Sequence, residues 1–157
     1  MKINSESNNY LANQTFWAIG KYKKTTPQSA IKGYLKRHNV PTIGLLLVDG
    51  SGRSRKNRLT PLALITLLNY IYSSPFKNDF LGSLAVARKR GTLKRRLSSL
   101  RGMVYAKTGY LYSVNALSGY LFSSTGNFSF SIIINDRNKN FSNWEFIEVF
   151  LSSLLKD

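Results

Sequence analysis

Three consecutive residues, Lys107-Thr108-Gly109, place a cation, a hydroxyl and a glycine at the end of a run that reads as a β-strand. A strand edge offers N–H and C=O groups to an extended peptide, which can dock there as an added strand. A lysine ammonium at this place favours the peptide's terminal carboxylate and the charge that develops during acyl transfer. Glycine lets a ligand approach the backbone closely. The tripeptide therefore predicts a peptide-binding strand with chemistry suited to acyl transfer.

A second candidate lies near the start of the chain, in Ser7-Asn8-Asn9. A serine hydroxyl on a loop can relay a proton, and an asparagine side chain can hold an amide of a bound peptide. The alternative interpretation is a polar cap before the first helix, where serine and asparagine are preferred. Ser113-Val114-Asn115 has the same spacing, but it lies too near Lys107 to form the opposite wall of one site.

Helices that could position these residues are indicated by apolar side chains at helical spacing. They are expected at 10–22, from Pro27 to about Asn39, at 62–72 and after Ser142. Thr26-Pro27 and Thr60-Pro61 each place a capping residue before a proline at the first helical position. The 62–72 segment is apolar nearly all round, which is typical of a buried helix.

The last helix opens with a capping box, Ser142 with Glu145. Its expected packing face consists of Trp144, Ile147, Phe150, Leu151 and Leu154.

Strands are expected near 103–107, 116–122 and 127–135, the last with alternating apolar and small polar residues. Three strands in succession suggest an antiparallel meander. Helices packed with such a sheet give an α+β fold class, here as a single domain covering 1–157. A further apolar run at 42–48 has the length of a strand, and 73–91 is expected to be irregular.

Six blocks of the sequence carry a resemblance to a known family. They are Ser7-Asn8-Asn9-Tyr10-Leu11-Ala12, Asp49-Gly50-Ser51-Gly52-Arg53-Ser54-Arg55, Asn57-Arg58-Leu59-Thr60-Pro61, Gly91-Thr92-Leu93-Lys94-Arg95-Arg96, Ala106-Lys107-Thr108-Gly109 and Leu117-Ser118-Gly119-Tyr120. In this order they resemble the latter part of the low-molecular-mass class C penicillin-binding proteins, the D-alanyl-D-alanine carboxypeptidase/endopeptidases. The expected fold is then a partial transpeptidase-like domain that runs from the SxN motif to the C-terminal helix.

The resemblance implies a serine acyl-transfer mechanism in which a nucleophilic serine releases the terminal D-Ala of a peptide and water clears the acyl-enzyme. By family position, Ser7, Asn9 and Lys107 would be catalytic. Thr108, Gly109 and Tyr110 would bind substrate. The implied partners are peptidoglycan stem peptides and β-lactams, the implied location is the periplasm or cell envelope, and neither a metal nor a cofactor is expected.

The chain departs from the family pattern at the nucleophile. The family's SxxK motif lies far before its SxN motif, so we expect it in an upstream polypeptide rather than in this chain. Strings that fit SxxK include Ser29-Ala30-Ile31-Lys32 and Ser74-Pro75-Phe76-Lys77, but neither of these has the family's order or surroundings. Tyr110 stands where the family usually has Thr or Ser, and Arg88-Lys89-Arg90 replace a block that usually carries Gly and Asp.

The charge of the chain supports a different class of function as an alternative. Its 23 Lys and Arg against 7 Asp and Glu give a net charge of +16. The excess is concentrated in two stretches, at 53–58 and at 88–101. Such a field attracts polyanions, so a catalytically inactive module that binds nucleic acid or an anionic cell-wall polymer is the alternative. No nucleic-acid recognition motif is present, and a solvated basic face is the third interpretation.

Size and composition bound the remaining possibilities. A chain of 157 residues with 43% hydrophobic residues is sufficient for one domain with a core. Without cysteine, neither disulfides nor a thiolate metal site can be invoked. The polar residues 1–9 lack the apolar region of a signal peptide, and the apolar run 62–68 is too short to span a bilayer.

Overall fold

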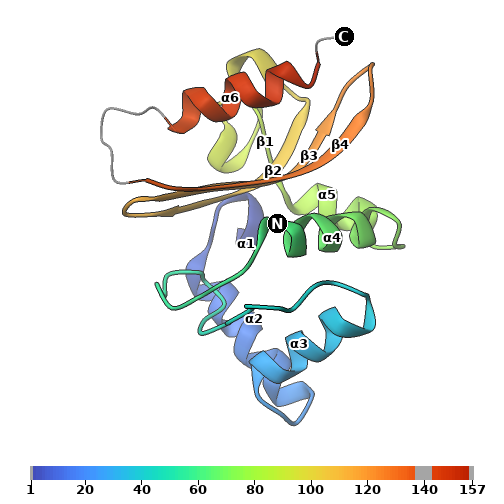
Figure 1. Cartoon of the computed structure of the whole chain (residues 1–157), viewed down its shortest axis with the longest axis vertical. Coiled ribbons are helices and arrows are strands. Elements are labelled where there is room, and N and C mark those ends of the chain that lie inside the picture. The colour runs from blue at the N-terminus through green and yellow to red at the C-terminus, as the bar shows by residue number, and fades with distance from the viewer. Residues whose placement is uncertain (1, 137–142, 156–157) are drawn as a thin grey trace.

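The computed structural model describes residues 2–136 and 143–155, in which helices cover both faces of one antiparallel sheet (Figure 1). Along the chain the elements are α1 (Lys2–Ser5), α2 (Asn9–Tyr22), α3 (Pro27–Arg37), α4 (Pro61–Tyr72), α5 (Lys77–Ser83), β1 (Ala85–Val86), the 3₁₀ turns η1 (Gly91–Leu93) and η2 (Ser98–Leu100), β2 (Val104–Leu111), β3 (Val114–Phe122), β4 (Asn127–Asn135) and α6 (Asn143–Ser153). The predicted α+β class is confirmed.

The sheet has the strand order β1-β2-β3-β4, so its last three strands form the predicted meander. β2 and β3 pair along their whole length, from Val104 opposite Leu121 to Leu111 opposite Val114. A Cβ at Gly119 on β3 would overlap the backbone of Tyr105 and Ala106 on β2, so this position requires glycine. No described helix is long and apolar enough to cross a membrane.

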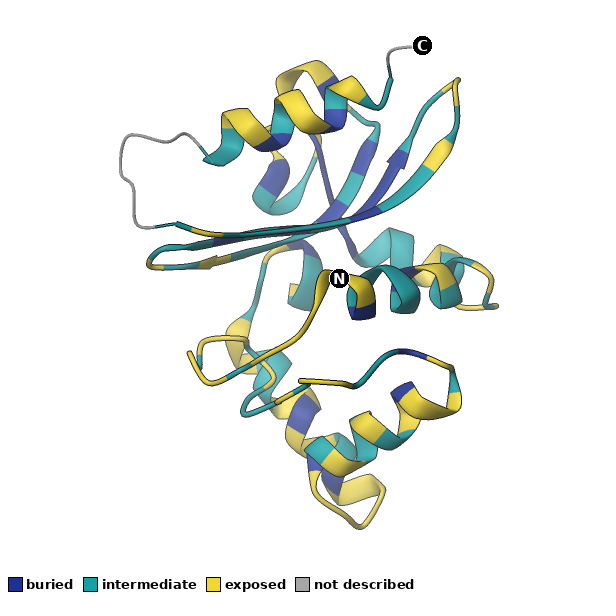
Figure 2. Cartoon of the chain, viewed as in Figure 1, coloured by how far each residue is buried: buried dark blue, intermediate teal, exposed yellow. Residues whose placement is uncertain are grey.

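The main core lies between the sheet and α6. Alternate strand residues point to opposite faces, and Val104, Ala106 and Leu117 point to the α6 face, where they pack with Ile147 and Leu151. All five side chains are inaccessible to solvent. Figure 2 shows this central layer in dark blue, whereas α2 and α3 are largely exposed.

The opposite face of the sheet packs against α4 and α5 through aromatic side chains. Tyr120 is buried beside Leu68 and Leu84, and its hydroxyl donates a hydrogen bond to the Leu68 carbonyl at 2.7 Å. Burial raises the pKa of Tyr120 to about 12. The phenol therefore remains a neutral donor that ties α4 to the sheet.

The caps predicted from the sequence are confirmed at two helices. The Thr26 hydroxyl accepts from the backbone N–H of Ser29, and that of Thr60 from Ala63. Each occupies one of the donors that a helix start leaves without an internal partner. The capping box at Ser142 falls partly outside the described residues.

Three predictions about local structure are wrong. The apolar 42–48 run is not a strand, because Pro41 and the positive φ of Gly44 break it and only Leu46 bridges to Arg58. The 73–91 segment contains α5 and β1 rather than being irregular. Strand β2 does not end at Lys107, since it continues to Leu111.

Two expectations about burial are also corrected. Helix α4 is not buried all round, because only Ala63 and Leu68 are buried and Leu62 is 62% exposed. On α6, Ile147 and Leu151 are buried as expected, but Phe150 is 43% exposed and lies off the packing face.

Candidate active site

Lys107 lies on β2 with its side chain on the face opposite α6. Its neighbour Ala106 points into the α6 core, so the alternation of the strand turns Lys107 towards the N-terminal helices. The Nζ atom donates a hydrogen bond to the hydroxyl of Ser7 at 2.8 Å and another to the carbonyl of Thr108. Two predicted catalytic residues that are 100 positions apart thus meet in space.

The environment of Lys107 disfavours its charge. Burial removes water from the ammonium group and lowers the pKa of Lys107 below its ordinary value. A lysine with a lowered pKa gives up a proton more readily, which is how proteins activate lysine for acid–base work.

Ser7 and Asn9 flank the start of α2 and play different local parts. Asn8 is the N-cap, because its side chain accepts from the Leu11 N–H at 2.9 Å. The capping task therefore does not use the Ser7 hydroxyl, which is bound to Lys107. Ser7 has a φ of 55°, a conformation that is uncommon outside glycine. Asn9 is exposed in the first turn of α2.

Thr108 points to the other face of β2, where its hydroxyl donates to the hydroxyl of Thr92 at 2.9 Å. Thr92 lies in η1 beside Gly91, which has a φ of 66°. A Cβ at Gly91 would overlap the carbonyl of Ser5. The 91–92 pair thus touches both β2 and the segment that precedes Ser7. Sequence reasoning missed this role, although Gly91-Thr92-Leu93 stood out as a block.

Beyond Lys107, no strand among the described residues pairs with the outer edge of β2. β1 pairs only with Tyr105 and Ala106. The carbonyl of Val104 accepts from the Ala87 N–H on that side. Backbone groups alternate along a strand, so the N–H and C=O groups of Thr108 and Tyr110 also point to the open edge.

The two other predicted substrate-binding residues line this open segment. Tyr110 is 77% exposed. Gly109 has Ala116 opposite it on β3, and a Cβ at Gly109 would come within 3.2 Å of the Ala116 side chain.

A loop at 49–58 contacts both α2 and the turn between β2 and β3. The side-chain oxygen of Asn13 on α2 accepts from the N–H groups of Gly50 and Ser51. Arg55 donates to the carbonyl of Tyr112, in the β2–β3 turn, at 2.9 Å. Inside the loop, burial acts to raise the pKa of Asp49. Hydrogen bonds to its carboxylate from three backbone N–H groups and from the Ser51 hydroxyl outweigh burial and hold the pKa of Asp49 below its usual value.

The SxxK strings that begin at Ser29 and Ser74 do not join this site. The Ser29 hydroxyl accepts from Thr26 in the first turn of α3, and the Ser74 hydroxyl donates to the Ile71 carbonyl. Neither hydroxyl has Lys107 or Ser7 as a hydrogen-bond partner, and α3 lies far from the sheet in Figure 1.

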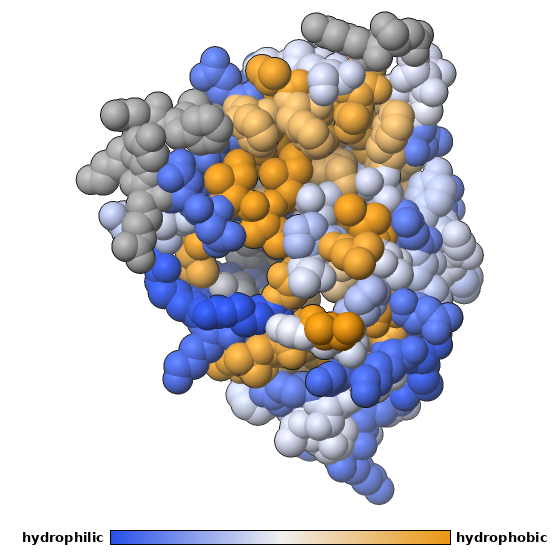
Figure 3. All heavy atoms as spheres, in the orientation of Figure 1, coloured by the Kyte–Doolittle hydropathy of each residue, from blue (hydrophilic) through white to orange (hydrophobic). Residues whose placement is uncertain are grey.

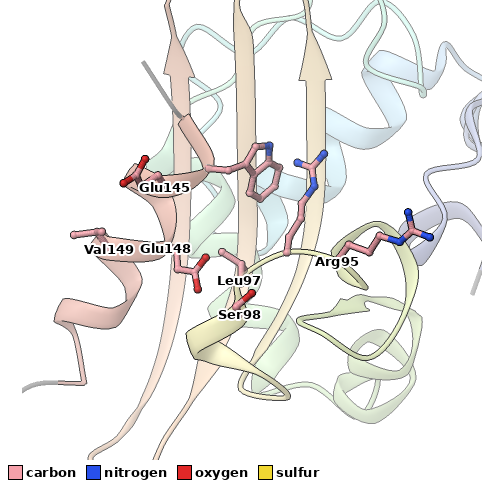
Figure 4. A pocket seen from close by; sticks show the side chains of 8 residues that line it. Arg95, Leu97, Ser98, Glu145, Glu148 and Val149 are labelled. Atoms are coloured by element: carbon pink, nitrogen blue, oxygen red, sulfur yellow. The ribbon is translucent and has the colours of Figure 1, made fainter. Parts of the chain in front are cut away.

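A hollow lies elsewhere, on the α6 side of the sheet (Figure 4). It measures about 370 Å³ and is lined by residues 95–98 together with Trp144, Glu145, Glu148 and Val149. The Arg96 guanidinium lies 3.8 Å from the Trp144 ring centre. Glu148 accepts from the N–H of Ser99 at 2.7 Å. These side chains support the fold on the face away from Lys107.

Comparison with known proteins gives a consistent result. Residues 1–150 match the D-Ala-D-Ala carboxypeptidase 3 (S13) family. A D-alanyl-D-alanine carboxypeptidase of Actinomadura is 41% identical over 103 residues, which are 61% of this chain and 19% of that protein. Penicillin-sensitive carboxypeptidase A of Dictyostelium discoideum is 33% identical over 132 residues, 78% of this chain and 25% of that protein.

Solved structures agree on the fold. Penicillin binding protein 4 (dacB) of Haemophilus influenzae, complexed with a β-lactam, superposes with a TM-score of 0.83 at 26% identity, covering 98% of this chain and 39% of its own. The Bd3459 predatory endopeptidase of Bdellovibrio bacteriovorus gives 0.80 at 25% identity, covering 98% and 43%. The chain spans only 19% to 28% of the length of the first three curated relatives.

Proposed function

Since the chain belongs to the D-Ala-D-Ala carboxypeptidase 3 (S13) family, we propose that it supplies two walls of a serine acyl-transfer site. One wall is the Ser7–Asn9 segment and the other is β2 from Lys107 to Tyr110. The observation that carries the proposal is the 2.8 Å hydrogen bond between Lys107 Nζ and Ser7 Oγ. Residues 1–157 form a single partial transpeptidase-like domain in this proposal.

The substrate is a peptide that ends in D-Ala-D-Ala, as in peptidoglycan stem peptides. It lies along the open edge of β2 and exchanges hydrogen bonds with the outward N–H and C=O groups of Thr108 and Tyr110. The exposed Asn9 carboxamide holds a peptide amide from the opposite wall. The Lys107 ammonium attracts the terminal carboxylate. Tyr110 contributes an aromatic surface in place of a smaller hydroxyl side chain.

The nucleophilic serine comes from polypeptide outside these 157 residues. Its Oγ attacks the carbonyl carbon of the penultimate D-Ala, and its proton passes to a neighbouring lysine of the same SxxK motif. The C–N bond to the terminal D-Ala breaks, and the leaving amine takes a proton from Ser7 Oγ, which Lys107 Nζ replenishes. Water then attacks the ester carbonyl, and its proton returns to Lys107 Nζ. The seryl C–O bond breaks, and the serine oxygen takes back the proton held by the SxxK lysine.

β-Lactams fit the same scheme because their strained amide acylates the same serine. Relatives support this point, since the Haemophilus influenzae protein is described in complex with a β-lactam and the Bd3459 endopeptidase as acylated by penicillin G. We place the activity at the cell envelope, where peptidoglycan is found.

A fluorescent penicillin tests the proposal. The chain is co-expressed with the part of the Haemophilus influenzae protein outside the matched region, and the purified pair is labelled. We expect the pair to be acylated and the isolated chain to remain unlabelled. In the pair, Ser7→Ala should slow acylation by about 10²- to 10⁴-fold, the range for a lost proton-transfer group. Ser98→Ala, an exposed serine beside α6, is the matched control and should label normally.

Two results would contradict the proposal. Covalent labelling of the isolated chain would show that the nucleophile is already present among its residues. Equal acylation rates for Ser7→Ala and Ser98→Ala would show that Ser7 takes no part in proton transfer.

A further inference from the structure

The hairpin of α2 and α3 ends in a surface that the candidate active site does not use. Residues 17–24, the hairpin tip, cover the C-terminal end of α2 and the start of the turn that follows. Trp17 is 58% exposed and Tyr22 is 81% exposed, and Lys21, Lys23 and Lys24 are exposed as well. Figure 1 places the turn between α2 and α3 at the lower end of the view, away from the sheet, and Figure 3 shows strongly hydrophilic residues gathered there.

The charge of this part of the chain has a single sign. Six Lys and Arg residues lie between Glu6 and Asp49, and no Asp or Glu lies between them. Half of these cations are the three lysines of the hairpin tip. The Nζ atom of Lys23 lies 5.1 Å from the centre of the Tyr22 ring, a cation–π contact that keeps ammonium and ring together at the surface. The hairpin tip therefore offers positive charge and aromatic surface to the same partner.

The backbone at Lys24 gives a second, independent observation. Lys23 is the C-cap of α2, and Lys24 follows it with a φ of 50°. The Thr25 N–H donates to the Gly20 carbonyl, and the Lys24 N–H donates to the Lys21 carbonyl. This is the hydrogen-bond pattern that usually has glycine at the position of Lys24. A side chain at this φ is unfavourable for folding, so stability alone does not explain a lysine there.

The chemistry of the hairpin tip selects its occupant. Tryptophan and tyrosine are enriched at the boundary between lipid headgroups and acyl chains, because their rings are apolar with one polar atom. Each lysine close to an anionic membrane adds to the attraction. Single-stranded nucleic acid also uses cations and aromatic rings, but proteins hold it in a groove, whereas the tip is the projecting end of a hairpin. The net charge of +16 opposes binding of a second copy.

We propose that the hairpin tip binds the surface of a membrane that contains anionic phospholipids. Trp17 and Tyr22 enter the headgroup region, and the three lysines contact lipid phosphates. Helix α2 has 14 residues, so Ser7, just before the helix, lies roughly 20 Å from the tip along the helix axis. Membrane contact at the tip thus leaves Ser7 and Lys107 accessible to a peptide. This inference goes beyond the proposed function, because it concerns where the chain is held and not which bond is cleaved.

Vesicle co-sedimentation tests the charge. The chain is mixed with vesicles of equimolar phosphatidylglycerol and phosphatidylcholine, and separately with vesicles of phosphatidylcholine alone. We expect binding to the anionic vesicles that weakens at least about tenfold when the three tip lysines are replaced by glutamine, since each contributes about fivefold. Replacing Lys94, Arg95 and Arg101 by glutamine is the matched control. It removes the same charge from exposed residues of the segment next to α6 and should weaken binding less than about twofold.

The aromatic residues need a separate variant. Trp17→Ser with Tyr22→Ser should weaken vesicle binding by a similar factor, because the apolar contact with the headgroup region is lost. Phe76→Ser with Tyr112→Ser, which removes two exposed aromatic residues elsewhere, should leave binding unchanged. The Trp17 ring also contacts Phe16 edge-on, so circular dichroism of each variant checks that it is folded.

Tryptophan fluorescence reports the depth of the hairpin tip directly. The chain has two tryptophans, so in a Trp144→Phe variant the emission comes from Trp17 alone. We expect this emission to shift to shorter wavelength when anionic vesicles are added and to stay unchanged with phosphatidylcholine vesicles.

Lys24→Gly separates binding from folding. Glycine accepts the positive φ at no steric cost, so the melting temperature should stay the same or rise. Vesicle binding should fall about fivefold, because one cation is lost. Asn39→Gly, which replaces another exposed residue with a positive φ, is the matched control and should bind vesicles normally.

Four results would overturn the proposal. They are no binding of the wild-type chain to anionic vesicles, equal losses from the two charge variants, an unshifted Trp17 emission, and unchanged vesicle binding by Lys24→Gly. Binding of a single-stranded oligonucleotide that depends on the tip lysines, without vesicle binding, would assign the tip to nucleic acid instead. Penicillin acylation is measured separately, so intact vesicle binding without acylation would support this inference and refute the proposed function alone.

Discussion

Lys107 and Ser7 each have a feature that is unfavourable for stability and that a residue with a purely structural role does not need. Burial lowers the pKa of Lys107, and Ser7 is held at a φ of 55°. Each condition is unfavourable by itself, and such features cluster at functional sites because the surrounding structure must hold them in place. The Lys107–Ser7 hydrogen bond is where the two meet.

The pKa of Lys107 predicts how stability responds to its removal. Burial disfavours the charged form of Lys107 in the folded state, so the protonated lysine opposes folding at neutral pH, and this penalty is lost as the pH rises past the unfolded pKa. We expect Lys107→Met to raise the melting temperature at pH 7 while abolishing penicillin acylation of the complex. The difference in melting temperature should shrink as the pH approaches about 10.4, the ordinary value for lysine. Melting temperatures of Lys107→Met and wild type, measured from pH 7 to about pH 10.4, test this prediction. A melting temperature of Lys107→Met below that of wild type at pH 7 would contradict it.

Gly91 allows a second prediction at the residue scale. Gly91→Ala should destabilise the chain by at least about 2 kcal/mol more than Gly52→Ala. Both glycines have positive φ, but a Cβ at Gly91 meets the Ser5 carbonyl, whereas at Gly52 nothing lies within 4 Å. Chemical denaturation of the two variants isolates the clash from the backbone conformation. Equal losses would mean that η1 and the segment before Ser7 can move apart freely.

Among the elements, the helix starts were the most predictable from sequence. Thr60 and Pro61 indicate where α4 begins because the capping hydroxyl and the fixed φ of proline act locally. The extent of β2 was not predictable in this way. Its last residues are held by pairing with β3 across a turn in which Ser113 takes a φ of 65°, without the glycine or asparagine that usually marks such a turn.

In the candidate site, too, the local motifs could be predicted from the sequence and the long-range contacts could not. Lys107-Thr108-Gly109 and Ser7-Asn8-Asn9 were recognisable because short motifs persist in sequence. Their 2.8 Å contact was not predictable from local pattern, since it depends on how α1 and α2 meet the sheet. The role of Thr92 was hidden for the same reason: its partner, Thr108, is 16 residues away.

The cap of α4 yields a prediction at the scale of the element. Thr60→Ala should lower the free energy of unfolding by about 1 kcal/mol, because the Ala63 N–H loses its partner. Thr15→Ala serves as the control, since the Thr15 hydroxyl bonds only the Leu11 carbonyl within α2. It should change stability by no more than about 0.5 kcal/mol. Urea titrations measure both, and equal values would argue against the cap.

At the scale of the whole molecule, the basic residues behind the net charge of +16 differ in whether they bond within the fold or are exposed to solvent. Arg90 is committed to the fold, because its guanidinium donates to the carbonyls of Leu84 and Leu81. Arg88, Arg95 and Arg101 are exposed within one segment. The alternative interpretation, a polyanion-binding module, therefore loses Arg90 from this cluster but keeps its exposed arginines and lysines.

Heparin chromatography tests that alternative. Replacing Arg88, Arg95 and Arg101 by glutamine should lower the salt concentration at elution more than replacing Lys32, Lys36 and Arg37, which are exposed on α3. Both triple variants remove the same charge, so a larger effect of the first identifies a focused patch. Equal shifts would show that only total charge matters, and no retention at physiological salt would exclude the module.

The 100 residues between Ser7 and Lys107 also have a consequence in time. At roughly 5 to 20 residues per second, a ribosome delivers Lys107 about 5 to 20 seconds after Ser7. Lys107 is then held in place only when β3, which ends at Phe122, has paired with β2. We therefore expect a chain released from the ribosome before that point to contain both residues without the strand pairing that positions them.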